Sequence, residues 1–191
     1  MFVSRVAAFL AVSLSAFGAD HVGLSRRQAQ AVPPEASGGV QLLVQLNAQR
    51  YSFGENPSFR ISLRNSGKEN LLLNGGELLG NGSEIWSSIT CELQTPTGQR
   101  LPLSLGWGVP GVAGRIYFLG VPLRSGSAYT VSVTPKDYYI AKSERLAVGI
   151  YDLACTYTGA QSMYRDSTQL PPCWEGVATS NTVRVEIEAK R

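Results

Sequence analysis

The stretch that decides the fold lies near the C-terminal end and consists of Leu146-Ala147-Val148-Gly149-Ile150-Tyr151-Asp152-Leu153. A tyrosine that opens a late strand just after a glycine is typical of a tyrosine corner. In such a corner the hydroxyl donates a hydrogen bond to the backbone upstream and fixes the crossing between the two sheets of a β-sandwich. The alternative is a tyrosine that only fills the core. We expect Tyr151 to form the corner.

Alternating apolar and polar residues surround this stretch. The alternating segments are 40–46, 59–63, 89–93, 101–105, 129–133, 151–157 and 183–187. Alternation of this kind is typical of antiparallel sheets with one face in the core. Turn sequences such as Pro96-Thr97-Gly98 lie between strands, and Asn74-Gly75-Gly76 and Asn81-Gly82 are predicted to flank a loop. No convincing helical period occurs, so we predict an all-β, antiparallel, immunoglobulin-like β-sandwich.

A resemblance to known modules supports this prediction. The residues that carry it are Tyr51–Phe59, Ile61–Asn65, Gly149–Tyr151, Trp174–Gly176 and Ser180–Val183. They resemble the opening and closing strands of secreted immunoglobulin-like modules of the macroglobulin, bacterial adhesion and proteinase-inhibitor types. The run Pro110–Arg115 is similar to a motif of an uncharacterised family of bacterial exported proteins. The resemblance covers residues 40–189 and implies a fold but no function.

The N-terminal segment is predicted to direct export. Arg5 precedes the apolar stretch Val6–Phe17, which has about the dozen residues of a signal peptide core. It is shorter than the roughly 20 residues that a membrane helix needs. Ala16-Phe17-Gly18 supplies small residues for a signal peptidase. We expect residues 1–18 to be a signal peptide, 19–39 a flexible leader and 40–191 a secreted or periplasmic domain with no membrane association after cleavage.

The cysteines agree with export. An oxidising compartment allows the three cysteines of the chain to form one disulfide and leave one thiol. We expect Cys155 to pair with Cys173, because a hairpin with these two opposite each other places Tyr151 opposite Val177 in a plausible core register. Cys91 would then stay reduced. The alternatives are a bridge from Cys91 to Cys155 between the sheets, as in antibody domains, and buried thiols that never meet.

The sequence offers little for catalysis. Nucleophilic catalysis by Ser or Cys usually needs a His base, and the single His of the chain, His21, lies in the predicted leader. Neither a G-x-S-x-G elbow nor a CxxC pair is present, and the Asp residues lie far apart. We therefore expect no catalytic residues, no metal and no cofactor. A pair of carboxylates brought together by the fold stays open, so an exported hydrolase is one alternative.

Two segments are candidates for binding. The first, 106–115, contains tryptophan, proline and arginine, and interfaces use tryptophan and arginine as anchors. The second, 159–172, corresponds to a loop that serves recognition in variable-type sandwiches. The alternative for both is a plain connection between strands. The candidate contact residues are Trp107, Pro110, Arg115, Tyr164, Arg165 and Trp174.

Charge excludes one class of partner. Lys and Arg number 17 against 14 Asp and Glu, and the basic residues are scattered. Nucleic-acid binding needs basic residues concentrated in one stripe, so we do not expect this protein to bind nucleic acid. The sequence therefore predicts an exported, non-enzymatic binding or structural module whose partner is a protein. A β-sandwich protease inhibitor is a further hypothesis, by analogy alone.

Overall fold

The computed structural model of the protein describes residues 38–106, 115–140, 145–161 and 172–190. The predicted signal peptide and most of the predicted leader lie outside these residues. Regular structure within them consists of strands. In chain order these are β1 (Val40–Leu46), β2 (Arg50–Ser52), β3 (Phe59–Asn65), β4 (Leu71–Leu79), β5 (Glu84–Ile85), β6 (Ile89–Gln94), β7 (Arg100–Leu105), β8 (Ile116–Leu123), β9 (Ala128–Val133), β10 (Tyr138–Ile140), β11 (Gly149–Gly159), β12 (Gly176–Thr179) and β13 (Val183–Glu188).

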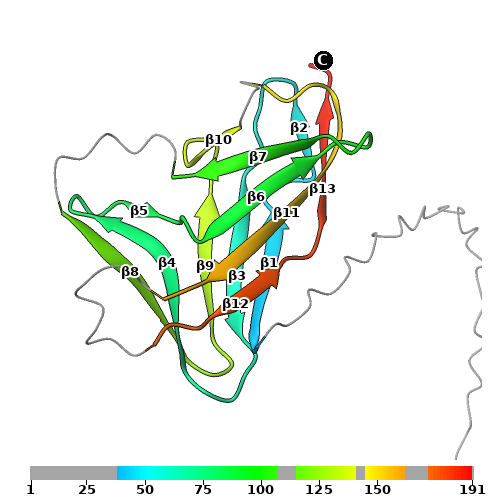
Figure 1. Cartoon of the computed structure of the whole chain (residues 1–191). Coiled ribbons are helices and arrows are strands. Elements are labelled where there is room, and N and C mark those ends of the chain that lie inside the picture. Colours follow the sequence, from blue (N-terminus) through cyan, green and yellow to red (C-terminus); the bar gives the residue numbers. More distant parts are fainter. Residues whose placement is uncertain (1–37, 107–114, 141–144, 162–171, 191) are drawn as a thin grey trace, which may run out of the picture. The chain divides into compact units, whose positions relative to one another are not determined.

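The strands form three sheets (Figure 1). The first has the order β1-β3-β9, and the second has the order β10-β7-β6-β11-β13-β2, with β12 also paired to β11. The third sheet, β5-β4-β8, is formed by segments on either side of β6 and β7 in the chain. Neighbouring strands are antiparallel except β13 and β2. The fold is an all-β, immunoglobulin-like β-sandwich, as predicted.

The core follows from the alternating pattern. All seven segments predicted from alternation are strands, and their apolar positions are buried or partly buried against the core. In β11, for example, Tyr151, Leu153, Cys155 and Tyr157 point inward. The predicted loop boundary at Asn74-Gly75-Gly76 is wrong, because these residues lie inside β4 at a shift of register against β8.

Tyr151 forms the predicted corner. Its hydroxyl donates a hydrogen bond to the carbonyl of Ala147 at 3.0 Å. The residue is 6% exposed, and Leu146 beside the acceptor is buried as well. The hydrogen bond fixes the chain where it enters β11, the strand that lies between β6 and β13.

The disulfide joins Cys91 to Cys155, so the predicted pairing of Cys155 with Cys173 is wrong. Thr156 lies opposite Thr179, which places Ser180 and not Cys173 beside Cys155. Cys173 lies before β12 and keeps a buried thiol. The register behind the prediction is also wrong, because Tyr151 faces Val185 and not Val177.

The bridge lies within one sheet, unlike the bridge of antibody domains. Cys155 and Cys91 are directly opposite each other on β11 and β6. The carbonyl of Cys155 accepts from the amide of Ser180, and its amide donates to the Ser180 hydroxyl, both at 2.9 Å. Both backbone groups therefore point away from Cys91. The cysteines form a non-hydrogen-bonded pair, the kind in which opposite Cα atoms lie closest, and their Cα atoms are 4.0 Å apart.

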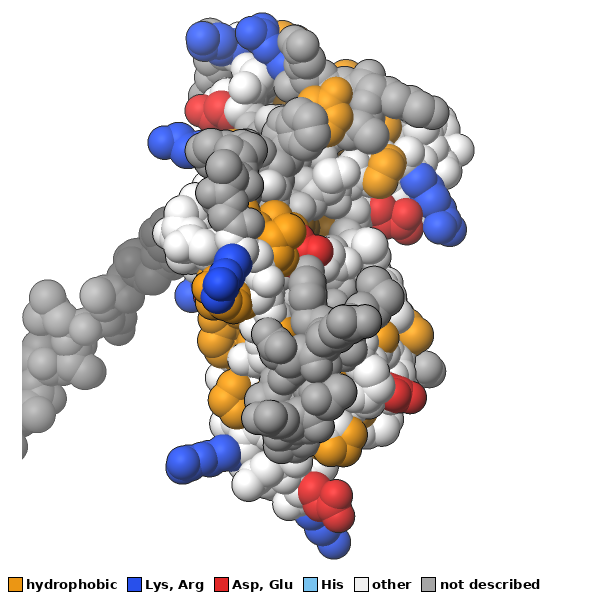
Figure 2. Space-filling view, turned by 60° about the vertical axis from the view of Figure 1, so that its left-hand side comes forward, with side chains coloured by type: hydrophobic (Ala, Val, Ile, Leu, Met, Phe, Trp, Pro, Cys, Tyr) orange, Lys and Arg blue, Asp and Glu red, His pale blue; other side chains and the backbone are white. Residues whose placement is uncertain are grey.

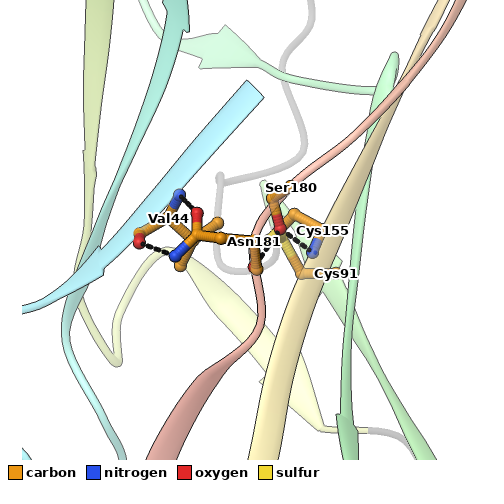
Figure 3. Close-up of a disulfide and its surroundings, with 5 residues drawn as sticks. All are labelled: Val44, Cys91, Cys155, Ser180 and Asn181. Carbon is orange, nitrogen blue, oxygen red and sulfur yellow. Dashed lines mark hydrogen bonds between the residues drawn. A yellow bond between two sulfur atoms is a disulfide. The ribbon is translucent and has the colours of Figure 1, made fainter. Parts of the chain in front are cut away.

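A bulge between β12 and β13 links the two main sheets (Figure 3). Two residues of β11 lie between Leu153 and Thr156, whereas three residues lie between their partners Val183 and Thr179. The extra residue turns the Asn181 side chain toward β1. Its oxygen accepts from the amide of Val44 at 2.8 Å, and its nitrogen donates to the carbonyl of Val44 at 3.0 Å.

The first prediction concerns the disulfide. The bridge spans a sequence separation of 64, and in the chain-entropy model its loss costs about 4 kcal/mol of unfolding free energy. The double variant Cys91→Ala/Cys155→Ala should lose about that much in urea titration, whereas Cys173→Ala should lose much less. Non-reducing peptide mapping that links Cys173 to either other cysteine would contradict the assignment.

The second prediction concerns the corner. Tyr151→Phe removes a hydrogen bond and keeps the ring, so it should lower the free energy of unfolding by about 1 kcal/mol. Tyr117→Phe is the control, because the Tyr117 side chain is exposed. Equal denaturation midpoints for the wild type and both variants would show that the ring of Tyr151 alone matters.

The third prediction concerns Asn181. Asn181→Ala leaves the amide and carbonyl of buried Val44 without this partner, so it should cost about 2 kcal/mol of unfolding free energy. Asn70→Ala is the matched control, since Asn70 accepts one exposed hydrogen bond from the amide of Ser125. A loss no larger than that of the control would mean that water replaces the Asn181 amide.

Candidate interaction surface

The structure describes two of the six predicted contact residues. Arg115 and Trp174 lie in the described part of the chain. Trp107, Pro110, Tyr164 and Arg165 lie outside the described residues. Arg115 is exposed at the start of β8, whereas Trp174 is buried.

Trp174 packs as a core residue and not as an exposed contact. Its ring stacks on Tyr157 with centroids 5.7 Å apart, and its Nε1 donates to the carbonyl of Gly38 at 3.0 Å. Gly159 and Gly176, which face each other across β11 and β12, lie against the indole. A Cβ on Gly176 would lie 2.7 Å from Cζ2 of Trp174, so the two glycines make the space that the ring occupies.

Gln161 joins the two ends of the second predicted binding segment. Its Oε1 accepts from the amide of Cys173 at 3.0 Å, and its Nε2 donates to the carbonyl of Cys173 at 2.8 Å. Neighbouring residues bind β4: Asn74 Nδ2 donates to the carbonyl of Ala160, and the amide of Trp174 donates to the carbonyl of Leu72. No signal in the sequence indicates this role of Gln161, because it depends on the register of the folded strands.

Buried tyrosines in the described part serve the fold. The hydroxyl of Tyr138 donates to the carbonyl of Pro57, and that of Tyr157 donates to the carbonyl of Asn74. Burial raises the pKa of both phenols. Both groups therefore stay protonated and act as hydrogen-bond donors at neutral pH.

Exposed apolar side chains follow Arg115 on β8. Ile116 is 49% exposed and Tyr117 is 48% exposed. β8 ends the third sheet, and among the described residues its pairing partner is β4 (Figure 1). Figure 2 brings this side of the molecule forward and shows hydrophobic side chains between dispersed charges, with no patch of one sign among the coloured side chains.

The hydrogen bonds of β4 show which backbone groups of β8 point outward. The amide of Leu79 donates to Ser83, and its carbonyl accepts from Gly82. Leu79 therefore uses both groups on the side away from its partner Ile116. The two form a non-hydrogen-bonded pair, so the amide and carbonyl of Ile116 point away from β4.

The backbone amide and carbonyl of every second residue of β8 point away from β4 in the same way. The outward residues are Ile116, Phe118, Gly120 and Pro122. At the other end of the pair, the carbonyl of Leu72 accepts from Trp174 and so also faces away from its partner Pro122. Proline on an edge strand with its nitrogen outward breaks no ladder hydrogen bond. The edge thus offers backbone donors and acceptors from Ile116 to Gly120.

Charge distinguishes the two ends of this edge from its middle. The chain contains no Asp or Glu between Glu92 and Asp137. Arg115 precedes β8 and Arg124 follows it, and both are exposed. A neutral strand is therefore bounded by a positive charge at each end.

Among the described residues, no group of three or more His, Cys, Asp and Glu side chains could hold a metal ion. The same residues include no helix with the length and apolar character needed to cross a membrane.

Comparisons with known proteins give a distant likeness. No family model matches the chain, and no curated protein matches its sequence. Among solved structures, the chain is similar to the CARDB domain of the PF1109 protein from Pyrococcus furiosus, whose crystal structure was determined in complex with di-metal ions. The sequence identity is 11% and the TM-score is 0.32, with 89% of this chain and 100% of that chain covered.

Proposed function

We propose that the protein is an exported, non-enzymatic binding module whose partner is another polypeptide. The observation that carries this proposal is the outer edge of β8, where exposed Ile116 and Tyr117 lie beside Arg115. Tyrosine and arginine are enriched among the residues that dominate binding energy at protein interfaces. The outward amides and carbonyls of the same strand add hydrogen-bonding capacity.

Export is supported by the disulfide. Bridges such as Cys91–Cys155 are typical of oxidising, extracellular or periplasmic compartments. Both cysteines are buried, at 3% and 1% exposure, so the bridge belongs to the core. The segment with signal-peptide character, residues 1–18, agrees with this compartment.

Binding has more support than hydrolysis. A shallow depression in the described part is lined by Gly38, Gly39, Asn65, Gly67, Lys68, Glu69 and Leu71. Its amide side chain, Asn65, already bonds the carbonyls of Glu69 and Leu123 and the amide of Gly67. No histidine lies in residues 38–191, so the depression has no imidazole base.

Protease inhibition has less support than general binding. An inhibitor of this type would insert a rigid exposed loop into a cleft. The segments predicted to make contacts include residues 107–114 and 162–171, which lie outside the described residues. The β8 edge is a strand and not an inserting loop.

The fourth prediction tests the proposed binding surface. A photoreactive phenylalanine analogue replaces Tyr117 in the full chain, and the same analogue replaces Val177 as a control. Val177 is 51% exposed on β12, in the second sheet. After irradiation in the exported fraction of the source cells, the Tyr117 position should give a discrete adduct with another polypeptide. Equal adducts from both positions, or none from Tyr117, would contradict the proposed function.

A further inference from the structure

The β8 edge has the chemistry of a sheet that can take one more strand. We propose that the partner adds an extended segment to β8 as a β-strand, and that this segment has apolar residues in its middle and carboxylates at its ends. This inference rests on the proposed binding function and specifies its mode and the chemistry of its partner.

Backbone geometry is the first reason. Ile116, Phe118 and Gly120 each direct one donor and one acceptor away from β4, at the spacing of a strand ladder. Pro122 has no amide hydrogen, so the ladder loses a donor there. An added strand would therefore pair with the first part of β8, over a length of roughly 20 Å for six residues.

The side chains along this edge are the second reason. Ile116 and Phe118 share one face of β8, and Tyr117 lies on the other. The ring of Phe118 lies against Gly120, since a Cβ on that glycine would meet Cε1 of Phe118 at 2.7 Å. Cross-strand pairs of aromatic and β-branched residues stabilise sheets. The middle of the incoming segment should therefore be apolar or β-branched.

Charge at the ends is the third reason. Arg115 and Arg124 bound β8, and residues 93–136 contain no carboxylate in the sequence. A carboxylate at the end of the incoming strand beside Ile116 would meet Arg115, and one at an end that extends past Pro122 would approach Arg124, whereas basic ends would be repelled. This charge pattern favours an acidic-ended peptide over a second copy of the chain, whose own β8 would bring two more arginines.

The other edges of the described sheets fit an added strand less well. β2, β5, β10 and β12 have four residues or fewer. On the outer edge of β1, Asn181 already binds both backbone groups of Val44. β9 exposes small or polar residues, Ala128, Thr130 and Ser132. β8 is longer, has exposed apolar side chains, and has no charged residue among those whose backbone groups point outward. Natural edge strands usually avoid this combination.

The experiment uses two synthetic peptides and the full chain. Both peptides contain the core Thr-Val-Thr-Val-Thr, one with Asp at both ends and one with Lys at both ends. Affinity is measured by fluorescence anisotropy at low ionic strength, and amide exchange of the protein is followed by NMR. We expect the Asp peptide to bind at least about fivefold more tightly than the Lys peptide. Its addition should slow exchange at Ile116, Phe118 and Gly120.

Two variants at one position separate backbone pairing from side-chain contact. Ile116→Pro removes an outward amide at the first residue of β8, a position where strands accept proline. Ile116→Val keeps the amide and the apolar side chain. The Asp peptide should bind the proline variant at least about tenfold more weakly and the valine variant within about twofold of the wild type. The thermal midpoint checks that each variant is folded. If the proline variant is unfolded, the slowing of amide exchange on β8 of the wild type is the test of strand addition.

Several results would overturn the inference. These are no binding of the Asp peptide, equal affinity for both peptides, and protection at β9 instead of β8. Self-association of the chain that Ile116→Pro abolishes and the Asp peptide does not inhibit would assign the edge to a second copy. A photo-adduct from position 117 without strand protection on β8 would leave the proposed binding function standing and remove only this mode.

Discussion

The pair of hydrogen bonds between Asn181 and Val44 holds the two main sheets together at one edge. Val44 lies within β1, and its outward backbone groups are buried at an edge where no strand of the described residues pairs with them. A side-chain amide offers one donor and one acceptor in the arrangement of a peptide group, so Asn181 replaces a missing strand at this residue. The bulge that aims Asn181 also places Ser180 on the backbone of Cys155. One extra residue thus aims Asn181 at β1, and Ser180 satisfies the backbone groups of Cys155 that its non-hydrogen-bonded pairing with Cys91 leaves free.

The sequence predicted the strands whose alternation is uninterrupted. β3 and β6 alternate over their whole length, and so the fold class and most of the core followed from them. The bounds of β4 were not predicted, because its register against β8 shifts between Asn74 and Gly76. Its buried positions therefore do not fall at every second residue. The disulfide was mispredicted because its partner depends on which strand pairs with β11. β6, from a distant part of the sequence, places Cys91 opposite Cys155, whereas the pairing with β12 places Ser180 and not Cys173 beside Cys155. Periodicity shows neither pairing.

The candidate surface was predicted in part. Arg115 was identified by residue type, but the neighbouring Ile116 and Tyr117 were not, because their exposure depends on which strands pair with β8. The long interval without carboxylates around β8 was a signal in the sequence that could have indicated this edge. Trp174 was identified for the same reason as Arg115, but the glycines opposite its ring give it space inside the fold.

The contacts of Gln161 with Cys173 have a consequence for protein engineering. They bring together the residues that flank 162–171, and hydrogen bonds from the Asn74 side chain to Ala160 and from the Trp174 amide to Leu72 attach these flanks to β4. The entropy of closing a loop grows only slowly with its length when the ends are already fixed. Foreign peptides of different lengths could therefore be grafted between Gln161 and Cys173 with little cost to the sandwich. The Gln161–Cys173 contact would then hold the two ends of the grafted peptide, with their spacing set by the amide side chain of Gln161.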